Sequence, residues 1–476
     1  MSTEPVTRRA HGRRRQSRAF AGGFAVVLGV LAALGLAGAA VGAAQGPRPT
    51  AVQFDPEAAV QASGSRLIIT MNQSLETVDP TQVEVTPAAP FTVDSSGRSV
   101  GLRFTLPLHD DTEYTVRIAD VEGVGGGPAT TITRTFRTPT LSAFLLRRSE
   151  GGDEIVRADI GSRRESTVYR SDHIEDFRAT SGHLVISTLD ADGNAQLVVT
   201  RLDGTGEREL DLPGAGTIMS LQAADRGEVI GYTFSDANLG SGGTRESALY
   251  VASVKDSEAD AAPTAVSVPG SETRVADWRF VPDTDSILVL TYDGRMLLSA
   301  ADGADATELG TGQQIDGIAR GSSVAIVRRV DDVYAVDLRD GSEAPLTRAQ
   351  DVPGLEGIAT PIPGESAGTV RQFFVLDAAD QDQVTNVYRI AEDGTPTEIF
   401  TAPAGDAVMQ TCVSPSGRYA AMIVAPDLVG NPYDGYLLPM PRTMVTHVVE
   451  LADGAAVQTL EGFDLSWCQT PPPLSQ

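Results

Sequence analysis

The stretch GFDLSWCQTPPPLSQ, residues 462–476, decides how the fold closes. Within it, Phe463–Thr470 has the composition of a β-strand and contains one of the two cysteines of the chain. Three prolines follow, and proline cannot continue a paired strand because it has no backbone N–H to donate. No later strand follows with which this segment could form a hairpin. We therefore expect it to pair with a strand that lies far away in the sequence.

A repeated strand pattern fills the residues before this segment. One strand type recurs seven times, and five of the seven copies end in Asp-Gly, which supplies the positive φ of a tight hairpin turn. The average spacing is about 50 residues, which is typical of four-stranded propeller blades. The seven copies are IVRADIGS at 155, LVVTRLDG at 197, LYVASVKD at 249, MLLSAADG at 296, VYAVDLRDG at 333, VYRIAEDG at 387 and HVVELADG at 447.

One copy of the unit also carries a family signature. The stretch VMQTCVSPSGRYAAMIVAP, residues 408–426, resembles the S-P-D-G-x-x-hydrophobic-A signature of TolB-like and WD-type propeller repeats, with Ser416 where aspartate is usual. The resemblance implies a β-propeller over residues 141–470 and says little about activity. The fold class that we expect is therefore all-β.

Counting strands indicates how this propeller closes. The first unit offers only LSAFLLRR, DEIVRADI and STVYRS, so the surplus FDLSWCQT would complete it and remove two unpaired sheet edges. The result would be a seven-bladed propeller closed by the C-terminal strand, with a tail at 471–476. Aligned on proline, TCVSP and WCQTP place Cys412 and Cys468 at the same blade position. We expect a Cys412–Cys468 disulfide, and two buried thiols are the alternative.

Seven strand-like runs precede the propeller, over residues 51–139. Several alternate apolar and polar residues with period two, which is typical of a β-sandwich. The stretches SGSRLIITMNQSLETVD, VEVTPAAPF, LPLHDDTEYTVRI and TFRTPT resemble the SbsA-type bacterial Ig-like domain. The resemblance implies a spacer or adhesive module at the cell surface and offers no catalytic residues.

The N-terminal region predicts a membrane anchor. Residues 19–44 carry no charge and are long enough to span a bilayer, and the basic stub at 1–18 favours a cytoplasmic N-terminus. A cleaved signal peptide is the alternative. A linker at 45–50 follows. Either reading exports the body of the chain to a compartment where a disulfide persists.

The exported body is strongly acidic. The first 45 residues hold 6 of the 37 basic and 1 of the 63 acidic residues, which leaves 31 basic and 62 acidic residues and a net charge of −31. Such a body repels nucleic acid and anionic lipid surfaces, so we expect no nucleic-acid partner.

Local motifs predict no catalytic, cofactor or metal site. GESAG at 364–368 matches a nucleophile elbow, but no α/β pattern surrounds Ser366. LDADGNAQ lacks the glycine and glutamate positions of a calcium loop, so a hairpin turn is the better interpretation of Asp190, Asp192 and Asn194. The histidines have no metal-like spacing; they are His11, His109, His173, His183 and His447.

The insertion DLVGNPYDGYLLPMPRT, residues 427–443, is rich in apolar side chains. It is either a contact site or a loop that folds back on its own blade.

Together these features predict a noncatalytic binding or scaffold protein in the cell membrane, single-pass, with its bulk extracytoplasmic. Its partner would be an extracytoplasmic protein or envelope ligand. The rival class is a cell-envelope hydrolase or lyase with its site at the propeller mouth.

Overall fold

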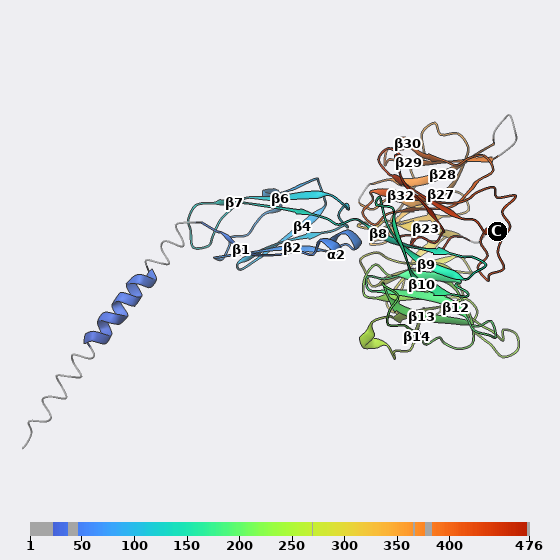
Figure 1. The fold of residues 1–476 in the computed structure, drawn as a ribbon, viewed down its shortest axis with the longest axis horizontal. Helices are drawn as coiled ribbons and strands as arrows, with labels where there is room; N and C mark the ends of the chain where they lie inside the picture. Colours follow the sequence, from blue (N-terminus) through green and yellow to red (C-terminus); the bar gives the residue numbers. More distant parts are fainter. Residues whose placement is uncertain (1–21, 37–45, 269, 365–366, 377–382, 474–476) are drawn as a thin grey trace, which may run out of the picture. The chain divides into compact units, whose positions relative to one another are not determined.

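A computed structural model of the chain describes residues 22–36, 46–268, 270–364, 367–376 and 383–473 (Figure 1). The described residues fall into two compact units. The first comprises the described parts of Met1–Phe54, together with Arg66–Arg103 and Tyr114–Phe136, and the second comprises Asp55–Ser65, Phe104–Glu113 and the described parts of Arg137–Gln476. Two segments inside the predicted spacer module, 55–65 and 104–113, thus group with the second unit.

The predicted membrane segment, residues 19–44, lies only partly among the described residues. Residues 22–36 form a helix in which every residue is exposed. The rest of the segment and the predicted stub at 1–18 lie outside the described residues. In the part of the chain that the structure describes, no helix combines the length and the apolar character needed to cross a membrane.

The first unit consists of two antiparallel sheets, with strand orders β1-β2-β5-β4 and β3-β6-β7 (Figure 1). Its strands lie where the alternating pattern predicts them, and a short 3₁₀ helix precedes β3. The elements are β1 (Pro49–Gln53), β2 (Arg66–Met71), η1 (Pro80–Gln82), β3 (Val83–Thr86), β4 (Phe91–Ser96), β5 (Ser99–Phe104), β6 (Glu113–Val121) and β7 (Thr130–Arg137).

Period-two alternation explains the core of this unit. On β2, Leu67, Ile69 and Met71 are buried, while the residues between them are at least partly accessible. Strand β6 repeats the pattern with Tyr114 and Val116 buried. One face of each strand therefore packs inward and the other meets solvent, as expected for a sheet with one covered face.

The second unit contains the helix α2 (Pro56–Gln61) and seven antiparallel sheets. The first sheet has three strands and the other six have four, and each sheet uses consecutive strands of the chain. The first four sheets contain β8 (Ser142–Arg147), β9 (Asp153–Asp159), β10 (Arg164–Ser171); β11 (Asp176–Ala179), β12 (His183–Leu189), β13 (Ala195–Arg201), β14 (Arg208–Leu210); β15 (Gly216–Ala223), β16 (Val229–Asp236), β17 (Ala248–Ser253), β18 (Thr264–Ala265); β19 (Val275–Phe280), β20 (Ser286–Thr291), β21 (Arg295–Ala300), β22 (Thr307–Thr311).

A short 3₁₀ helix, η2 (Asp256–Glu258), precedes β18 in the third sheet. The last three sheets follow the same plan as the first four. These sheets contain β23 (Gln314–Ile318), β24 (Val324–Arg328), β25 (Val333–Asp337), β26 (Glu343–Pro345); β27 (Leu355–Pro361), β28 (Thr369–Leu376), β29 (Gln383–Ile390), β30 (Pro396–Thr401); β31 (Ala407–Val413), β32 (Tyr419–Ala425), β33 (Val445–Glu450), β34 (Ala456–Glu461). The arrangement is all-β and consistent with a β-propeller.

The sheets face one another. The second strand of a sheet is buried on both faces, and all seven residues of β32 are buried. For this reason such strands have continuous apolar sequences without alternation. The innermost strands contact one another in chain order, from β8 to β11, β15, β19, β23, β27 and β31.

The five Asp-Gly turns have one geometry, which confirms the prediction of tight turns. Each glycine has φ between 73° and 87°. In the first of them Asp203 Oδ1 accepts a hydrogen bond from the Thr205 N–H at 3.0 Å. A Cβ on Gly204 would lie 1.8 Å from the carbonyl oxygen of Val168 on the preceding sheet, and one on Gly303 would lie 2.2 Å from that of Ser267. Glycine is therefore required both by the turn and by close packing between sheets.

The described C-terminal segment, residues 463–473 and called the tail from here on, closes the arrangement at the first sheet. Leu146 and Phe463 exchange two backbone hydrogen bonds of 2.9 and 3.0 Å, and the Ser466 N–H donates to the Phe144 carbonyl at 2.9 Å. The prediction of a strand over Phe463–Thr470 is wrong in its length, because only Phe463 forms a β-bridge. The chain turns after residue 465, which carries Cys468 away from the edge of β8 and toward β31.

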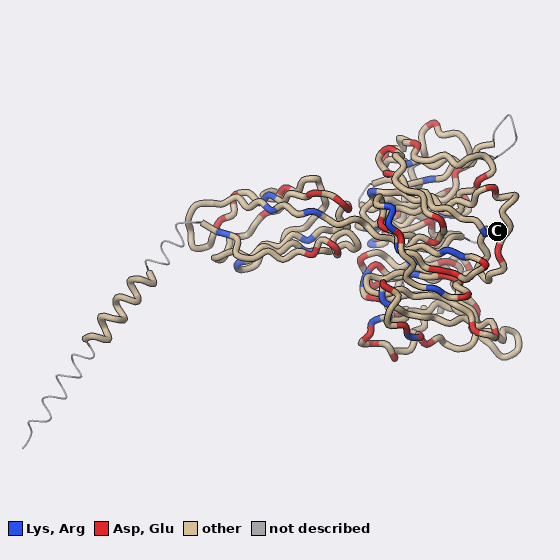
Figure 2. Tube along the Cα trace, in the orientation of Figure 1, with Lys and Arg blue, Asp and Glu red and all other residues tan. Residues whose placement is uncertain are grey.

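Negative charge is spread along the chain. Figure 2 shows Asp and Glu on strands and loops throughout both units, with Arg between them. Many of these acidic residues are paired with arginine, as at Arg295–Glu308 (2.6 Å) and Arg348–Asp332 (2.9 Å). The net negative charge of the sequence therefore reflects an excess of acidic residues that is dispersed along the chain.

Candidate functional site

Polar side chains on the innermost strands bond to the sheet that follows, and β19 shows the pattern. Asp277 Oδ1 accepts from the Trp278 N–H at 2.9 Å, and its Oδ2 accepts from the Ile315 N–H at 2.9 Å. Arg279 pairs with Asp277 and donates through Nη2 to the Ile315 carbonyl at 2.6 Å. One Asp-aromatic-Arg triplet therefore links the fourth sheet to the fifth.

Strand β11 carries the same triplet with one addition. Asp176 Oδ1 accepts from the Phe177 N–H at 2.8 Å and lies 3.2 Å from Arg178 Nη1. Arg178 donates through Nε to the Leu221 carbonyl of the third sheet at 2.7 Å. The addition is Asp464 of the tail, whose Oδ1 accepts from Arg178 Nη1 at 2.6 Å. This arginine thus joins the second sheet to the third and to the tail.

Each remaining pair of neighbouring sheets has a comparable bond. The four bonds are Gln222 Nε2 to the Trp278 carbonyl (2.7 Å), the Ala359 N–H to Asp316 Oδ2 (3.0 Å), Thr360 Oγ1 to the Thr411 carbonyl (3.1 Å), and Gln410 Nε2 to the Thr470 carbonyl (3.0 Å). Together with the two arginines, these bonds link all seven sheets in order. A buried polar group must be hydrogen-bonded, so this register of sheets is strongly favoured over others.

A disulfide completes the link between the last sheet and the tail. Cys412 on β31 and Cys468 on the tail are bonded, with their Cα atoms 5.2 Å apart, and both residues are buried. This is the pair that the alignment on proline indicates. The described cysteines include no free thiol.

The inner strands surround a cavity of about 620 Å³. Its walls come from the inner strands of the second to seventh sheets and from the tail, and eight of the lining residues are charged. These are Arg148, Glu175, Asp176, Asp277, Arg279, Asp316, Arg320 and Asp464. A second cavity of about 420 Å³ shares Trp467, Cys468 and Gln469 with the first. The tail therefore separates two cavities inside the second unit.

Two carboxyl groups in the larger cavity have raised pKa values. Burial raises the pKa of Asp176 well above its usual value, the neighbouring Asp464 raises it further, and Arg178 opposes the shift. Burial also raises the pKa of Asp316, against the lowering effect of Arg328, which lies 2.9 Å away. A buried carboxylate is costly unless it is fully paired, so burial disfavours the charged form of both groups.

Three buried oxygen atoms among the lining residues accept no hydrogen bond from the described residues. They are Asp176 Oδ2, Asp316 Oδ1 and Gln410 Oε1. In each of these groups the other polar atom is already hydrogen-bonded. The side chain therefore cannot rotate to place its unsatisfied oxygen elsewhere. Gln410, for example, must keep its amide nitrogen toward the carbonyls of Thr470 and Pro471, at 3.0 and 3.2 Å. Unsatisfied buried acceptors are rare in proteins and indicate a place for water or a ligand.

The insertion at 427–443 reaches the rim of this cavity. The Leu437 and Leu438 N–H groups donate to the two carboxylate oxygens of Glu175, each at 2.9 Å. The Tyr436 hydroxyl donates to Asp153 Oδ2 at 2.8 Å, and the Tyr436 ring stacks on His173 with centroids 4.2 Å apart. The insertion therefore packs on the first sheet and on the connection to the second. The expectation that the insertion folds back on its own blade is therefore wrong in its partner, because Asp153 and Glu175 lie outside the sheet that carries the insertion.

An ion pair strengthens this docking. Arg148 Nη1 lies 2.7 Å from Asp434 Oδ2, and its guanidinium lies 3.9 Å from the centre of the Tyr436 ring. Both charged side chains are at least nine-tenths buried. The apolar tip stays in solvent, where Val429 is 99% and Leu437 is 45% exposed.

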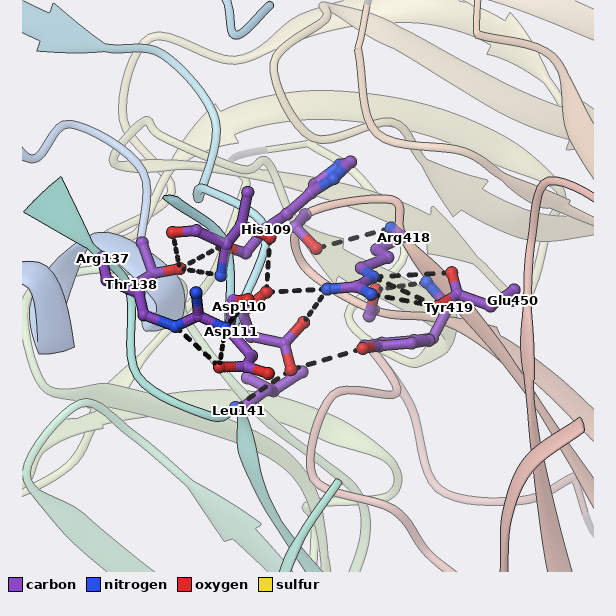
Figure 3. Close-up of polar contacts among 12 residues, drawn as sticks. His109, Asp110, Asp111, Arg137, Thr138, Leu141, Arg418, Tyr419 and Glu450 are labelled. Carbon is purple, nitrogen blue, oxygen red and sulfur yellow. Dashed lines mark hydrogen bonds and ion pairs between the residues drawn. The ribbon is translucent and has the colours of Figure 1, made fainter. Parts of the chain in front are cut away.

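A second polar cluster fastens the segment Phe104–Glu113 to the last sheet of its unit (Figure 3). Asp110 is 2% exposed, and its Oδ1 lies 3.1 Å from Arg418 Nη1. Its Oδ2 accepts from the Tyr419 hydroxyl at 3.3 Å and from the Leu141 N–H at 3.3 Å. Arg418 also pairs with Glu450 at 3.1 Å. Because every charge here has a partner within the cluster, its role is structural.

The structure assigns local roles to the other candidate residues. Asp190 accepts from the N–H groups of Asp192 and Asn194, each at 2.8 Å, as in the predicted hairpin turn. His173 and His183 bond to Glu175 and Glu228 at 2.6 and 2.8 Å. Among the described residues no group of three His, Cys, Asp or Glu side chains could hold a metal ion. Ser366 and His11 lie outside the described residues.

Sequence reasoning missed Asp176, Arg178 and Asp464. Arg178 and Asp464 are 286 residues apart in the chain, and neither belongs to a known motif. The signal that could have found two of them is the repeated triplet, Asp-Phe-Arg at 176 and Asp-Trp-Arg at 277, on equivalent inner strands.

The known proteins that are similar to the chain are solved structures of low sequence identity. No family model and no curated protein matches the chain. Solved structures similar to it include an oligogalacturonate lyase in complex with manganese (11% identity, 80% of this chain and 94% of that one, TM-score 0.42). Others are TolB from Acinetobacter baumannii (10%, 81% and 83%, TM-score 0.37) and the β-propeller domain of Swd1 from Myceliophteria thermophila (10%, 62% and 87%, TM-score 0.38). The chain is structurally similar to β-propellers, a fold that proteins of different functions share.

Proposed function

We propose that the chain is a noncatalytic, membrane-anchored binding or scaffold protein outside the cytoplasm. The second unit is a seven-bladed propeller, closed by the tail on its first blade, and it presents the 620 Å³ cavity to a ligand or partner. The first unit is the Ig-like spacer, and residues 19–44 are the anchor.

The observation that carries the proposal is the set of unsatisfied buried acceptors in the cavity. Most buried side chains that support the fold have their hydrogen bonds completed inside the protein, as Asp110 does. Asp176, Asp316 and Gln410 each keep one oxygen without a donor. A concave site with a few rigidly held polar groups is typical of ligand binding.

Two features support a location outside the cytoplasm. The Cys412–Cys468 disulfide is of a kind that persists in oxidising compartments. The described helix at 22–36 exposes apolar side chains along its whole length, among them Phe24, Leu31 and Leu36. Burial of such a surface in lipid is favourable, as the proposal of an anchor requires.

The alternative is a hydrolase or lyase at the propeller mouth. It is favoured by the raised pKa of Asp176, because a carboxyl whose protonated form is favoured by burial can act as a general acid. The binding proposal accounts for Asp316 and Gln410 as well, and for this reason we prefer it.

Site-specific photo-crosslinking in intact cells tests the proposal. A photoreactive phenylalanine replaces Tyr292, which lines the cavity and is 57% exposed, and in a matched control it replaces Val330, which is 87% exposed and does not line the cavity. We expect an envelope component to be captured through position 292 and not through position 330. Equal capture at the two positions, or capture only at 330, contradicts the proposal.

A further inference from the structure

The chemistry of the cavity indicates which ligand group it binds. Five buried polar atoms of the lining residues have no hydrogen-bond partner among the described residues. Three are acceptors, two of them carboxyl oxygens, and the other two are the indole N–H donors of Trp278 and Trp467. A carboxyl oxygen without a donor in a buried site is satisfied best by a charged N–H donor, because such hydrogen bonds are the strong ones. The cavity therefore suits a ligand that donates several hydrogen bonds and carries positive charge.

The arginines that line the cavity do not supply these donors, because each is already paired. Arg148 is bonded to Asp434, Arg279 to Asp277, and Arg320 lies 2.6 Å from Asp225. The other lining carboxylates are also satisfied. Glu175 accepts from the insertion with both oxygens, and Asp277 is bonded through both of its oxygens.

We propose, building on the binding function above, that the cavity receives the guanidinium or ammonium group of an arginine or lysine side chain from a partner chain. Asp176, with Asp464 beside it, binds the charge, and Asp316 and Gln410 accept further N–H groups. The net charge of −31 outside the first 45 residues attracts such a group from a distance.

A bound cation lowers the pKa of Asp176, because a nearby positive charge favours the carboxylate. In the free protein the charged groups that act on Asp176 are Arg178 on the same strand and Asp464 on the tail. Binding therefore favours release of a proton from Asp176 to solvent, and a ligand N–H donates to the carboxylate.

The tail favours a side chain of a polypeptide over a free polyamine. The indole N–H of Trp467, which lines the cavity, is buried and donates to no acceptor of the described residues. A polypeptide brings carbonyl oxygens next to its cationic side chain, whereas a polyamine has no acceptor. Trp467 is also one of only two tryptophans, so binding is visible in the fluorescence of the protein.

Isothermal titration of the full chain with three probes tests the inference. The probes are N-acetylarginine amide, its neutral isostere N-acetylcitrulline amide, and spermidine. We expect the arginine probe to bind at least about tenfold more tightly than the citrulline probe, because only the arginine probe donates charged hydrogen bonds. Titrations in two buffers of different ionisation enthalpy are expected to reveal proton release.

Two isosteric variants locate the site. In Asp176→Asn and Asp316→Asn the amide oxygen keeps the existing bond, and an NH₂ donor replaces only the unsatisfied oxygen. Each is expected to weaken the arginine probe about tenfold or more, and Asp176→Asn is expected to abolish proton release. The control Asp211→Asn removes an exposed carboxylate outside the cavity, with the same change in net charge, and leaves binding unchanged.

Each outcome is decisive. Equal affinity for the arginine and citrulline probes, no binding of either, or full affinity in both cavity variants overturns the inference. Binding of spermidine alone overturns the side-chain assignment in favour of a free polyamine. Crosslinking at position 292 together with any of these results leaves the binding function standing with a different ligand chemistry.

Discussion

Reduction of the Cys412–Cys468 disulfide measures how much the covalent link adds to the stability of the second unit. The two residues are 56 positions apart, so the loop-closure relation gives about 14 cal/mol/K of lost unfolded-state entropy, or about 4 kcal/mol at 25 °C. Residues 137–476 number about 340, and an unfolding entropy of about 2.1 cal/mol/K per residue then predicts a fall in Tm of about 6 °C.

The noncovalent part of the closure remains after reduction. The bonds between Leu146 and Phe463, the Ser466–Phe144 bond and the Arg178–Asp464 pair need no disulfide. We therefore expect the reduced protein to stay folded at 25 °C, with a lower Tm, and not to open.

Tryptophan fluorescence during heating is the suitable assay. Both tryptophans, Trp278 and Trp467, belong to the second unit, so the first unit does not contribute to the signal. The oxidised and reduced wild-type chains are compared, and the double variant Cys412→Ser/Cys468→Ser serves as the control whose melting does not respond to reductant. A Tm that reduction leaves within about 1 °C, or a reduced chain already unfolded at 25 °C, refutes the reasoning.

Three further substitutions test other parts of the second unit. The raised pKa of Asp176 means that the folded state holds its proton more tightly, so this group's contribution to stability is full below the unfolded pKa of about 3.8 and is lost as pH rises through the folded pKa. Asp176→Asn is therefore expected to gain stability relative to wild type as the pH rises from about 4 in urea titrations, and a constant difference contradicts the shift. Arg418→Ala leaves Asp110 without its cation and is expected to lower the free energy of unfolding by about 2 kcal/mol. This loss is smaller than for a fully buried pair, because Arg418 is 27% exposed. Urea unfolding measures the change, and a loss under about 0.5 kcal/mol argues against an anchoring role. Tyr436→Phe removes the hydrogen bond to Asp153, which is worth about 1.5–3 kcal/mol. The variant is therefore expected to be cleaved faster by a protease within residues 427–443. An unchanged cleavage rate shows that the hydroxyl does not hold the insertion.

Local features of this fold could be predicted from the sequence because their causes are local. Asp-Gly predicts its own turn, since aspartate bonds to the backbone two residues later and glycine adopts positive φ. Counting strands predicted where the tail pairs, and the alignment on proline indicated Cys412 and Cys468. The predicted length of the closing strand was wrong, because the chain turns after residue 465 and Cys468 bonds to Cys412 in another sheet.

The candidate site could not be predicted in the same way, because it depends on residues far apart in the chain. Asp464 meets Arg178 across 286 positions, and Tyr436 meets Asp153 across 283. The direction in which the insertion folds follows from acceptors on Asp153 and Glu175, which no pattern near residue 436 reveals. Similarly, an unsatisfied oxygen is recognised only after every neighbouring donor has been located.

Pairing of Phe463 with β8 has a consequence for biosynthesis. The edge of Ser142–Arg147 becomes available early in translation, yet its partner is made only after six more sheets. Until residues 463–468 have left the ribosome, that edge is open to pairing with other chains. Formation of this contact is also slow, because it joins distant parts of the chain. Folding helpers that shield strand edges are therefore needed most for the first sheet of this protein, during the interval before the tail arrives.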